Sequence, residues 1–518
     1  MIYDKITLLN GSIVKNLTIV NGTEAERLAS IAPQIGEAFY QTDGVIGNYV
    51  YNGTAWEVSA LDASKQVLKI GSPQSHLGGA LITQDNKMFV WGNQDSGELG
   101  IGTTTTSYQL PQEVHFPVDE TGHVVQGLLI SQASFALMST GNLYSWGYGG
   151  AGALGHGDTA NQSTPKKVAT FNGTVSEIIY NKAISYSVND WPIVVKLTNG
   201  EYWASGNNNQ GQLGLGNTVQ QNSFFQLVTP DPGSSPITNV WILGSTYGAM
   251  FIKTANNKLW AAGYNGYGQL GLGNTTSPNV FTEITFFTTN AIDIVDIHGA
   301  CGYFDTALNT VSSFIYLDIN GNVYSAGGNQ FGQLGNGTIG GANQTTPVQV
   351  TLTKPVSEIH AFGGGAMTVY CKNTDGTFVR WGYNPYGQLG DGTFTDNGIP
   401  NQSTTQIDKI FTSEDANTYS YRSSVWLLQS DGILVGAGRN NVGQLGIGST
   451  TDASTYTPIL FNEPTNVTDI RAHGYADQFY STLVTSDGKL YTCGYGGRNG
   501  LGIENVVLNQ NTFRRVIL

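Results

Sequence analysis

The chain has 518 residues, a formal net charge of −14 and 68 glycines, and only 12% of its residues are charged. Its 26 Tyr, 21 Phe and 9 Trp supply enough apolar surface for a large core, which excludes an intrinsically disordered chain. The acidic balance, 37 Asp+Glu against 23 Lys+Arg, argues against nucleic acid as a partner, because neutralising phosphates requires a basic surface.

The cysteines and the apolar runs exclude further classes. Cys301, Cys371 and Cys493 are too far apart for a disulfide framework or a C-x-x-C metal site. The first residues lack the basic start and apolar core of a signal peptide, and no apolar run approaches the ~18 residues of a membrane helix. We therefore expect folding in a cytoplasm and no insertion into a membrane.

The first 61 residues differ from the rest of the chain and are predicted to form a separate N-terminal segment. Residues 36–57 alternate apolar and polar residues around two turns, which predicts a β-hairpin. The stretch resembles a hairpin module of bacteriophage tail-fibre and other virion fibre proteins, and the resemblance implies attachment or oligomerisation. It is carried by Phe39, Tyr40, Asp43, Gly44, Tyr49, Tyr51, Gly53 and Trp56. The alternative is a hairpin that only covers the following domain.

Residues 62–518 contain eight copies of one unit of about 57 residues. A glycine that ends a W-G-like step marks each copy: Gly92, Gly147, Gly206, Gly263, Gly327, Gly382, Gly438 and Gly494. Two apolar residues spaced V-x-x-I mark each copy as well: Val67/Ile70, Val125/Leu128, Val175/Ile178, Ile237/Val240, Ile294/Ile297, Val356/Ile359, Ile407/Ile410 and Val467/Ile470. Since two markers of different chemistry give the same count, the repeat is a property of the fold.

Each unit is predicted to contain four short strands. Asn-Gly and Asp-Gly pairs, which favour type I′ turns, follow the second apolar run at 199–200, 320–321, 375–376, 431–432 and 487–488. A repeated unit of four antiparallel strands is typical of a β-propeller blade. We predict an all-β fold: a single β-propeller of eight four-stranded blades, with seven blades as the alternative, preceded by a small N-terminal β-hairpin segment.

The residues "W-G-x-N-x-x-G-Q-L-G-x-G", clearest in "WGYNPYGQLGDG" at 381–392, resemble the regulator of chromosome condensation repeat family. The resemblance covers about residues 64–518 and implies a propeller, although the family usually closes with seven blades. Trp91, Trp146 and Trp381 occupy the tryptophan position, and five units replace it with Ser, Ala or Cys.

Gly266, Gly268 and Gly271 spell G-x-G-x-x-G, the spacing of a dinucleotide-binding turn. The pattern returns in most units, no helical pattern follows it and no G-K-[ST] step is present. We interpret these loops as compact turns whose leucine fills the space between blades, and we predict no cofactor.

No set of catalytic residues is apparent. His298 and His360 occupy equivalent places in neighbouring units, so radial symmetry could bring them together, but no zinc-binding spacing accompanies them. Asp391 and Asp396 lack the D-x-D-x-D-G spacing of a calcium loop. We predict no catalytic or metal-binding residue and no enzymatic activity.

The loops between the first and second strands of the units vary in length and carry aromatic and acidic residues. In a closed propeller they gather on one face, and such a surface suits glycans or protein epitopes. The predicted binding residues are Tyr186, Asp190, Trp191, Tyr247, Tyr303, Phe304, Asp305, Tyr419, Tyr421, Tyr475 and Asp477. The alternative is that these side chains fill space under long loops.

From these features we predict a non-enzymatic bacteriophage virion fibre or receptor-binding protein, located in the virion. Residues 1–61 would join other virion proteins or further copies of the chain, and the propeller would bind a host cell-surface glycan or protein. Two alternatives remain: an intracellular protein-interaction propeller like the namesake of the family, and a glycan-processing propeller enzyme, for which no acid pair is evident.

Overall fold

The computed structural model describes the backbone of five strands within the first 65 residues and most of the chain from residue 67 to residue 516. Within 67–516 the residues not described are 71, 75–77, 93, 105–106, 131, 181–191, 245–246, 303–310, 364–365, 414–422, 460–466, 476–477, 486–487, 498–500 and 504–507.

The N-terminal strands form one sheet with the order β1-β2-β3-β4-β5. β2 and β3 are parallel, and the other neighbours are antiparallel. The strands are β1 (Ile2–Thr7), β2 (Ile13–Gly22), β3 (Ala38–Gln41), β4 (Asn48–Tyr51) and β5 (Trp56–Val58). The interval that predicts a hairpin therefore holds β3, β4 and the start of β5, within a larger sheet than the sequence pattern predicts.

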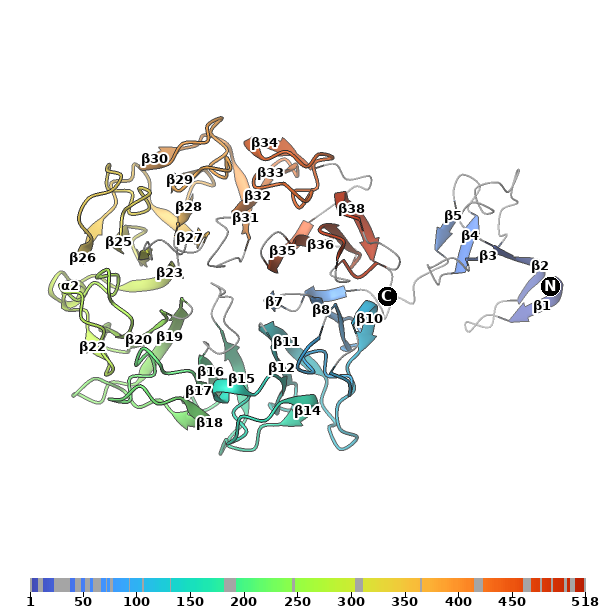
Figure 1. Cartoon of the computed structure of the whole chain (residues 1–518), viewed down its shortest axis with the longest axis horizontal. Helices are drawn as coiled ribbons and strands as arrows, with labels where there is room; N and C mark the ends of the chain where they lie inside the picture. Colours follow the sequence, from blue (N-terminus) through green and yellow to red (C-terminus); the bar gives the residue numbers. More distant parts are fainter. Residues whose placement is uncertain are drawn as a thin grey trace.

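The remaining strands form eight sheets arranged in a ring (Figure 1), called here blades 1 to 8. Blades 3 to 8 are each built from four consecutive strands. Blade 1 contains β6 (Val67–Ile70), β8 (Gly78–Thr83), β9 (Met88–Gly92) and β10 (Tyr108–Glu113), and blade 2 contains β11 (Val124–Ile130), β12 (Ala133–Met138), β13 (Leu143–Gly147) and β14 (Gln162–Lys167). Blade 3 contains β15 (Val175–Ile179), β16 (Pro192–Leu197), β17 (Tyr202–Gly206) and β18 (Gln221–Gln226), and blade 4 contains β19 (Ile237–Leu243), β20 (Ala249–Thr254), β21 (Leu259–Gly263) and β22 (Thr282–Glu283). Blade 5 contains β23 (Ile294–Gly302), β24 (Val311–Asp318), β25 (Val323–Gly327) and β26 (Gln344–Gln349), and blade 6 contains β27 (Val356–Phe362), β28 (Thr368–Asn373), β29 (Phe378–Gly382) and β30 (Asn397–Gln402). Blade 7 contains β31 (Ile407–Thr412), β32 (Ser424–Gln429), β33 (Leu434–Gly438) and β34 (Ala453–Pro458), and blade 8 contains β35 (Val467–Tyr475), β36 (Gln478–Thr485), β37 (Leu490–Gly494) and β38 (Gln510–Val516).

The predicted all-β propeller is confirmed. Seven of these eight sheets have four strands each, and seven is the number of four-stranded blades in the alternative prediction. The sheet of blade 2 has five, because β7 (Ser72–Gln74), from the preceding unit, pairs in parallel with β11. The sheets of the ring equal the eight repeat units in number. The short helices are η2 (Gly150–Gly152) and α2 (Thr285–Thr289), and no helix in the described part of the chain is long and apolar enough to cross a membrane.

The hydrophobic core lies between the blades. Each of eight clusters of buried side chains combines residues of two consecutive blades. The last cluster closes the ring, because Trp91 of blade 1 packs with Leu490 and Val516 of blade 8. β38 pairs with β37 of its own blade, and the first and last blades are joined by side-chain packing and by a hydrogen bond from Val67 N to Gly488 O (2.8 Å).

The "GQLG" loops are structural, as predicted. Gly268 has a φ of +73°, and a Cβ added there would lie 2.6 Å from Thr345 Cα of blade 5. Asn265 accepts a hydrogen bond from Leu270 N (2.9 Å), and Gln269 Oε1 accepts one from Tyr267 N (3.1 Å). The loop leucines are all at most 1% exposed: Leu99, Leu154, Leu213, Leu270, Leu334, Leu389, Leu445 and Leu501. The polar groups of the motif thus hold the loop itself together.

In units without the repeat tryptophan, a ring from another part of the blade fills the space that the indole occupies elsewhere. In blades 2 and 6 the indole lies against a loop glycine of the preceding blade, as Trp146 lies against Gly100. In five other blades a residue of the outer strand or just before it occupies this place: Phe224, Phe281, Pro347, Tyr456 and Phe513. Small residues at 205, 262, 326, 437 and 493 are therefore compensated by a ring from the neighbouring strand.

One repeat marker in unit 2 is corrected by the strand register. Val124 pairs with Met138 and Val175 pairs with Leu197, so Val124 and Val175 are equivalent. The V-x-x-I pair of unit 2 begins at Val124 and has Gly127 at its second position. The prediction of Val125/Leu128 was wrong by one residue, because it relied on side-chain type where Gly127 leaves space for the side chain of Met88.

Candidate functional site

The innermost strands of the blades carry one equivalent residue each, which we call position three. The pairing of each innermost strand with the second strand shifts after its first residue, and the third residue resumes the pairing. The residues at position three are Lys69, Gln126, Glu177, Asn239, Asp296, Glu358, Lys409 and Asp469.

In three blades the residue at position three joins its blade to the next one. Lys69 and Lys409 donate to a backbone carbonyl of the next innermost strand, at 3.3 and 2.9 Å. Gln126 donates to the carbonyl of Ile178 at 3.1 Å. Glu177 of blade 3 cannot donate such a bond when ionised, because a carboxylate only accepts.

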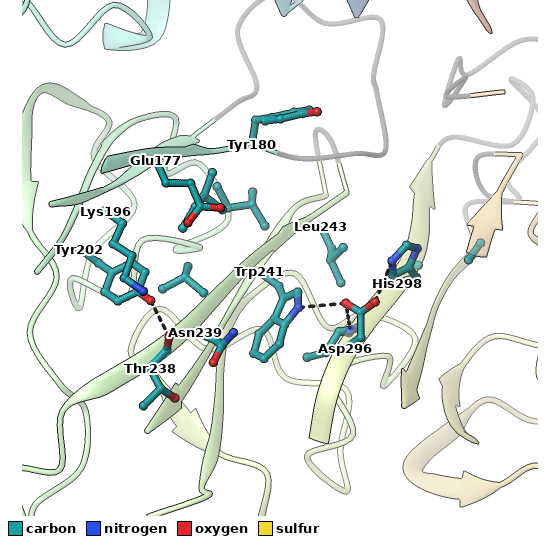
Figure 2. A pocket seen from close by; sticks show the side chains of 16 residues that line it. Glu177, Tyr180, Lys196, Tyr202, Thr238, Asn239, Trp241, Leu243, Asp296 and His298 are labelled. Atoms are coloured by element: carbon teal, nitrogen blue, oxygen red, sulfur yellow. Dashed lines mark hydrogen bonds and ion pairs between the residues drawn. The ribbon is translucent and has the colours of Figure 1, made fainter. Parts of the chain in front are cut away.

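A cavity lies next to Glu177. The carbonyl of Thr238, on the innermost strand of blade 4, accepts its hydrogen bond from the Tyr202 hydroxyl (2.6 Å) instead. The cavity has a volume of about 240 Å³ and extends along β19 between β15 and β23 (Figure 2). Its lining includes Glu177, Ile179, Tyr180, Lys196, Tyr202, Thr238, Asn239, Val240, Trp241, Ile242, Leu243, Asp296, Ile297 and His298.

Lys196 lies across the strand pair from Glu177. Its equivalents Lys253 and Lys372 donate to a backbone carbonyl of the next blade at 2.9 and 2.7 Å. The Lys196 ammonium instead lies 5.2 Å from the centre of the Tyr202 ring. Among the described residues, the side chains of Glu177 and Lys196 have neither a hydrogen bond nor an ion pair, so their charged groups are available to a ligand.

Asp296 fixes the orientation of two rings in the lining. It accepts hydrogen bonds from Trp241 Nε1 (3.2 Å) and from Ile297 N (2.9 Å). Its other carboxylate oxygen lies 3.3 Å from His298 Nε2. Because these contacts hold the N–H edge of the indole, the half-buried ring of Trp241 forms a fixed wall of the cavity (Figure 2).

The equivalent histidines His298 and His360 lie side by side, with ring centroids 6.0 Å apart. His360 Nε2 lies 3.6 Å from a carboxylate oxygen of Glu358. The contact with His360 lowers the pKa of Glu358, against the opposing effect of burial. Within the described ranges no group of three or more His, Cys, Asp or Glu residues could hold a metal ion.

The predicted binding residues can be placed only in part. Tyr247 is half-buried and packs its ring on Tyr264, with centroids 4.5 Å apart. Tyr475 is the last residue of β35. Outside the described residues lie Tyr186, Asp190, Trp191, Tyr303, Phe304, Asp305, Tyr419, Tyr421 and Asp477.

The sequence interpretation did not identify Glu177, Lys196, Tyr202 or Trp241 as site residues. A signal was present: aligning the innermost strands puts a glutamate where two other blades have lysine and one has glutamine. That alignment requires the strand register, which the V-x-x-I marker alone misses in unit 2.

Comparison with protein families finds the repeat directly. Residues 85–127, 140–183 and 320–370 match the profile of the Regulator of chromosome condensation (RCC1) repeat. Three segments of the chain are thus similar to RCC1 repeats. With the ring of blades, these matches make the chain similar to RCC1-repeat β-propellers.

The relatives are eukaryotic proteins. The chain is 26% identical over 389 residues to the Ultraviolet-B receptor UVR8 of Arabidopsis thaliana, a match that covers 75% of this chain and 80% of UVR8. It is 25% identical over 361 residues to the mitochondrial RCC1 domain-containing protein RUG3 of the same plant, covering 68% of this chain and 73% of RUG3. A match of 27% identity to the human E3 ubiquitin-protein ligase HERC2 covers 68% of this chain and 7% of HERC2.

Solved structures share the fold. Prp20p of Saccharomyces cerevisiae aligns with a TM-score of 0.53 at 18% identity, covering 82% of this chain and 95% of that one. Human WBSCR16 aligns with a TM-score of 0.50 at 18% identity, covering 73% of this chain and 95% of that one. At these identities the likeness concerns the propeller alone.

These relatives overturn the predicted biological role of the propeller. The prediction of a bacteriophage fibre protein located in the virion was wrong, because the relatives named here are plant, human and yeast proteins. The predicted partners, other virion proteins and a host cell surface, were wrong for the same reason. The prediction depended on about twenty residues of an N-terminal hairpin, whereas the relatives match most of the propeller.

Proposed function

We propose that this RCC1-repeat propeller is a non-catalytic protein-interaction module whose partner contacts the innermost strands around the cavity of blades 3 to 5. The observation that carries the proposal is that blade 3 lacks, at two equivalent positions, the side-chain contacts to the next blade that other blades make. Glu177 and Lys196 occupy positions that join neighbouring blades elsewhere in the ring, yet here their charged groups remain available beside a cavity.

The size of the cavity favours a protein partner over a cofactor. Small-molecule and cofactor sites have volumes of roughly 300–1,000 Å³. A cavity of about 240 Å³ accommodates one side chain more readily than a nucleotide or a sugar chain. The polar groups of the glycine loops are used within the loops, which removes the most plausible phosphate site.

The aromatic loops between first and second strands belong to the same proposal. Tyr180, which lines the cavity, immediately precedes the interval 181–191 that contains Tyr186, Asp190 and Trp191. A partner segment that enters the cavity would therefore lie close to the start of one predicted binding loop. Yeast Prp20p, which shares the fold, binds Gsp1p and histones, so a propeller of this kind can serve as a protein-binding scaffold.

Site-specific photo-crosslinking tests the proposal. A benzophenone amino acid replaces Asn239, an exposed residue of the cavity lining, or Val228, which follows the outermost strand of blade 3 and is 76% exposed. After irradiation in the cells that make the protein, we expect a discrete cross-linked protein from position 239 and none from position 228. Trp241→Ala should reduce the yield from position 239. Cross-links from position 228 alone would contradict the proposal.

A further inference from the structure

We propose that the cavity binds the cationic side chain of an arginine or lysine in a partner protein, with Glu177 as its counter-ion. The inference rests on the proposed function, because it names the chemistry of the partner at that same site. Glu177 is exposed on the innermost strand, and no cation lies within ion-pair distance of it among the described residues. A guanidinium or ammonium group of a partner protein would form the ion pair that Glu177 lacks among the described residues.

The charges in the lining favour a cation. Glu177 and Asp296 are two carboxylates against the ammonium of Lys196, and His298 of the lining lies 3.3 Å from Asp296 and not beside Glu177. Lys196 lies over the Tyr202 ring, and this contact holds its ammonium toward an aromatic face. The whole chain carries a formal net charge of −14, which attracts basic partners over longer distances.

The aromatic walls favour the same ligand. A cation is attracted to the face of an aromatic ring, and tryptophan is the strongest partner. The hydrogen bond from Trp241 Nε1 to Asp296 fixes the indole in place before any ligand arrives. Tyr180 contributes a second ring to the lining. The cavity thus combines a preorganised ring with an unpaired carboxylate.

The floor of the cavity fits the stem of a long cationic side chain. Val240, Ile242 and Leu243 line it and are themselves 3–6% exposed, so they present an apolar surface. Arginine and lysine bury their methylene groups along apolar surface while the charged end remains among polar groups. An acidic side chain is shorter and would meet the carboxylates of Glu177 and Asp296.

Fluorine NMR with three short probes tests the inference. The full chain is labelled with 5-fluorotryptophan, and the Trp241 resonance among the 9 tryptophans is assigned with Trp241→Phe. The probes are acetylated, amidated Gly-Arg-Gly, Gly-Glu-Gly and Gly-Leu-Gly. We expect a saturable shift of the Trp241 resonance with Gly-Arg-Gly at millimolar concentrations and none with the other two. Unchanged resonances of the other tryptophans verify that each variant is folded.

Two charge variants give opposite expected signs. Glu177→Gln should weaken Gly-Arg-Gly binding by about two- to fivefold, the range of an exposed ion pair, and Lys196→Gln should leave it unchanged or strengthen it. Binding of Gly-Glu-Gly that Lys196→Gln abolishes would overturn the inference, as would absence of any shift or an undiminished shift in Glu177→Gln. Because the titration needs no partner protein, a negative result alongside cross-linking at position 239 overturns this inference and leaves the proposed function standing.

Discussion

The replacement of the repeat tryptophan by a ring from the outer strand can be tested by exchanging the two. Phe224 lies against the loop glycine Gly155, and a Cβ added to that glycine would lie 2.3 Å from Phe224 Cε2 and 3.4 Å from Ser205 Oγ. Trp146 has the same relation to Gly100, because a Cβ added to Gly100 would lie 2.4 Å from Trp146 Nε1. A tryptophan at position 205 and a phenylalanine at position 224 therefore compete for one space.

The two single substitutions should each destabilise the protein. Phe224 is 3% exposed, and removal of a buried phenylalanine ring costs about 3–5 kcal/mol. Ser205→Trp alone adds a ring to a filled space, and overpacking costs about 1–3 kcal/mol. In the double variant the indole enters the space that Phe224 leaves, so we expect recovery of about 2–3 kcal/mol relative to the sum of the single effects.

Guanidinium unfolding followed by circular dichroism measures these effects, with the midpoint and slope compared across the four proteins. Ile433→Trp at an exposed turn position, combined with Phe224→Ala, is the matched control and should give no recovery. A double variant less stable than either single variant would refute the equivalence of the two positions.

Three further predictions concern other parts of the chain. Burial raises the pKa of Glu98, so the wild type should lose stability as the pH rises from the ordinary glutamate range through that raised pKa. Unfolding measured across this pH range should show the loss in the wild type and not in Glu98→Gln. The same pH profile in both proteins would contradict the prediction. Gly268→Ala should lower the unfolding free energy by at least about 2 kcal/mol, because it adds a clash with neighbouring backbone to the strain of a positive φ. Gly337 has a φ of +86° and open space around it, so Gly337→Ala should lower the unfolding free energy by less. Equal losses in the two variants would argue against the clash. The combined replacement of Trp191, Tyr303 and Tyr421, three of the predicted binding residues, by alanine should weaken the affinity for a cross-linked partner at least about tenfold without shifting the unfolding midpoint, because residues that only contact a partner add little to the core. Unchanged affinity would place the contact elsewhere.

The blades could be predicted because their determinants are local and periodic. A turn dipeptide such as Asn199-Gly200 specifies its own hairpin, and a residue such as Leu270 is buried wherever the loop recurs. Eight repetitions of weak signals add to a strong one. The fifth strand of blade 2 was not predicted, because β7 pairs with β11 more than fifty residues away and has no repeated counterpart.

The ring replacements and the cavity could not be predicted from a single unit. The compensation of Ser205 by Phe224 depends on contact with a glycine of the preceding blade, which no pattern within one unit contains. Glu177 looks like any other exposed residue of a strand. It becomes informative only when the register aligns it with the lysines and the glutamine that join other blades.

The error about biological role has a different physical origin. A propeller supports many functions, and the residues that specify the fold are those buried between its blades. The hairpin resemblance concerned a segment with no bearing on those residues. Function on such a scaffold depends on side chains that the fold does not use.

That reasoning gives a way to search a repeat protein for its site. In a ring of equivalent units, a polar group that bonds to the next blade in several units has a structural role, and selection for stability explains it. Where the same position keeps a charged residue with neither that bond nor an ion pair among the described residues, stability no longer explains the charge. Glu177 and Lys196 meet this criterion together, on adjoining strands and beside one cavity. The Tyr202 hydroxyl supplies the missing contact to Thr238, so the blades remain joined while the Glu177 carboxylate has no partner among the described residues.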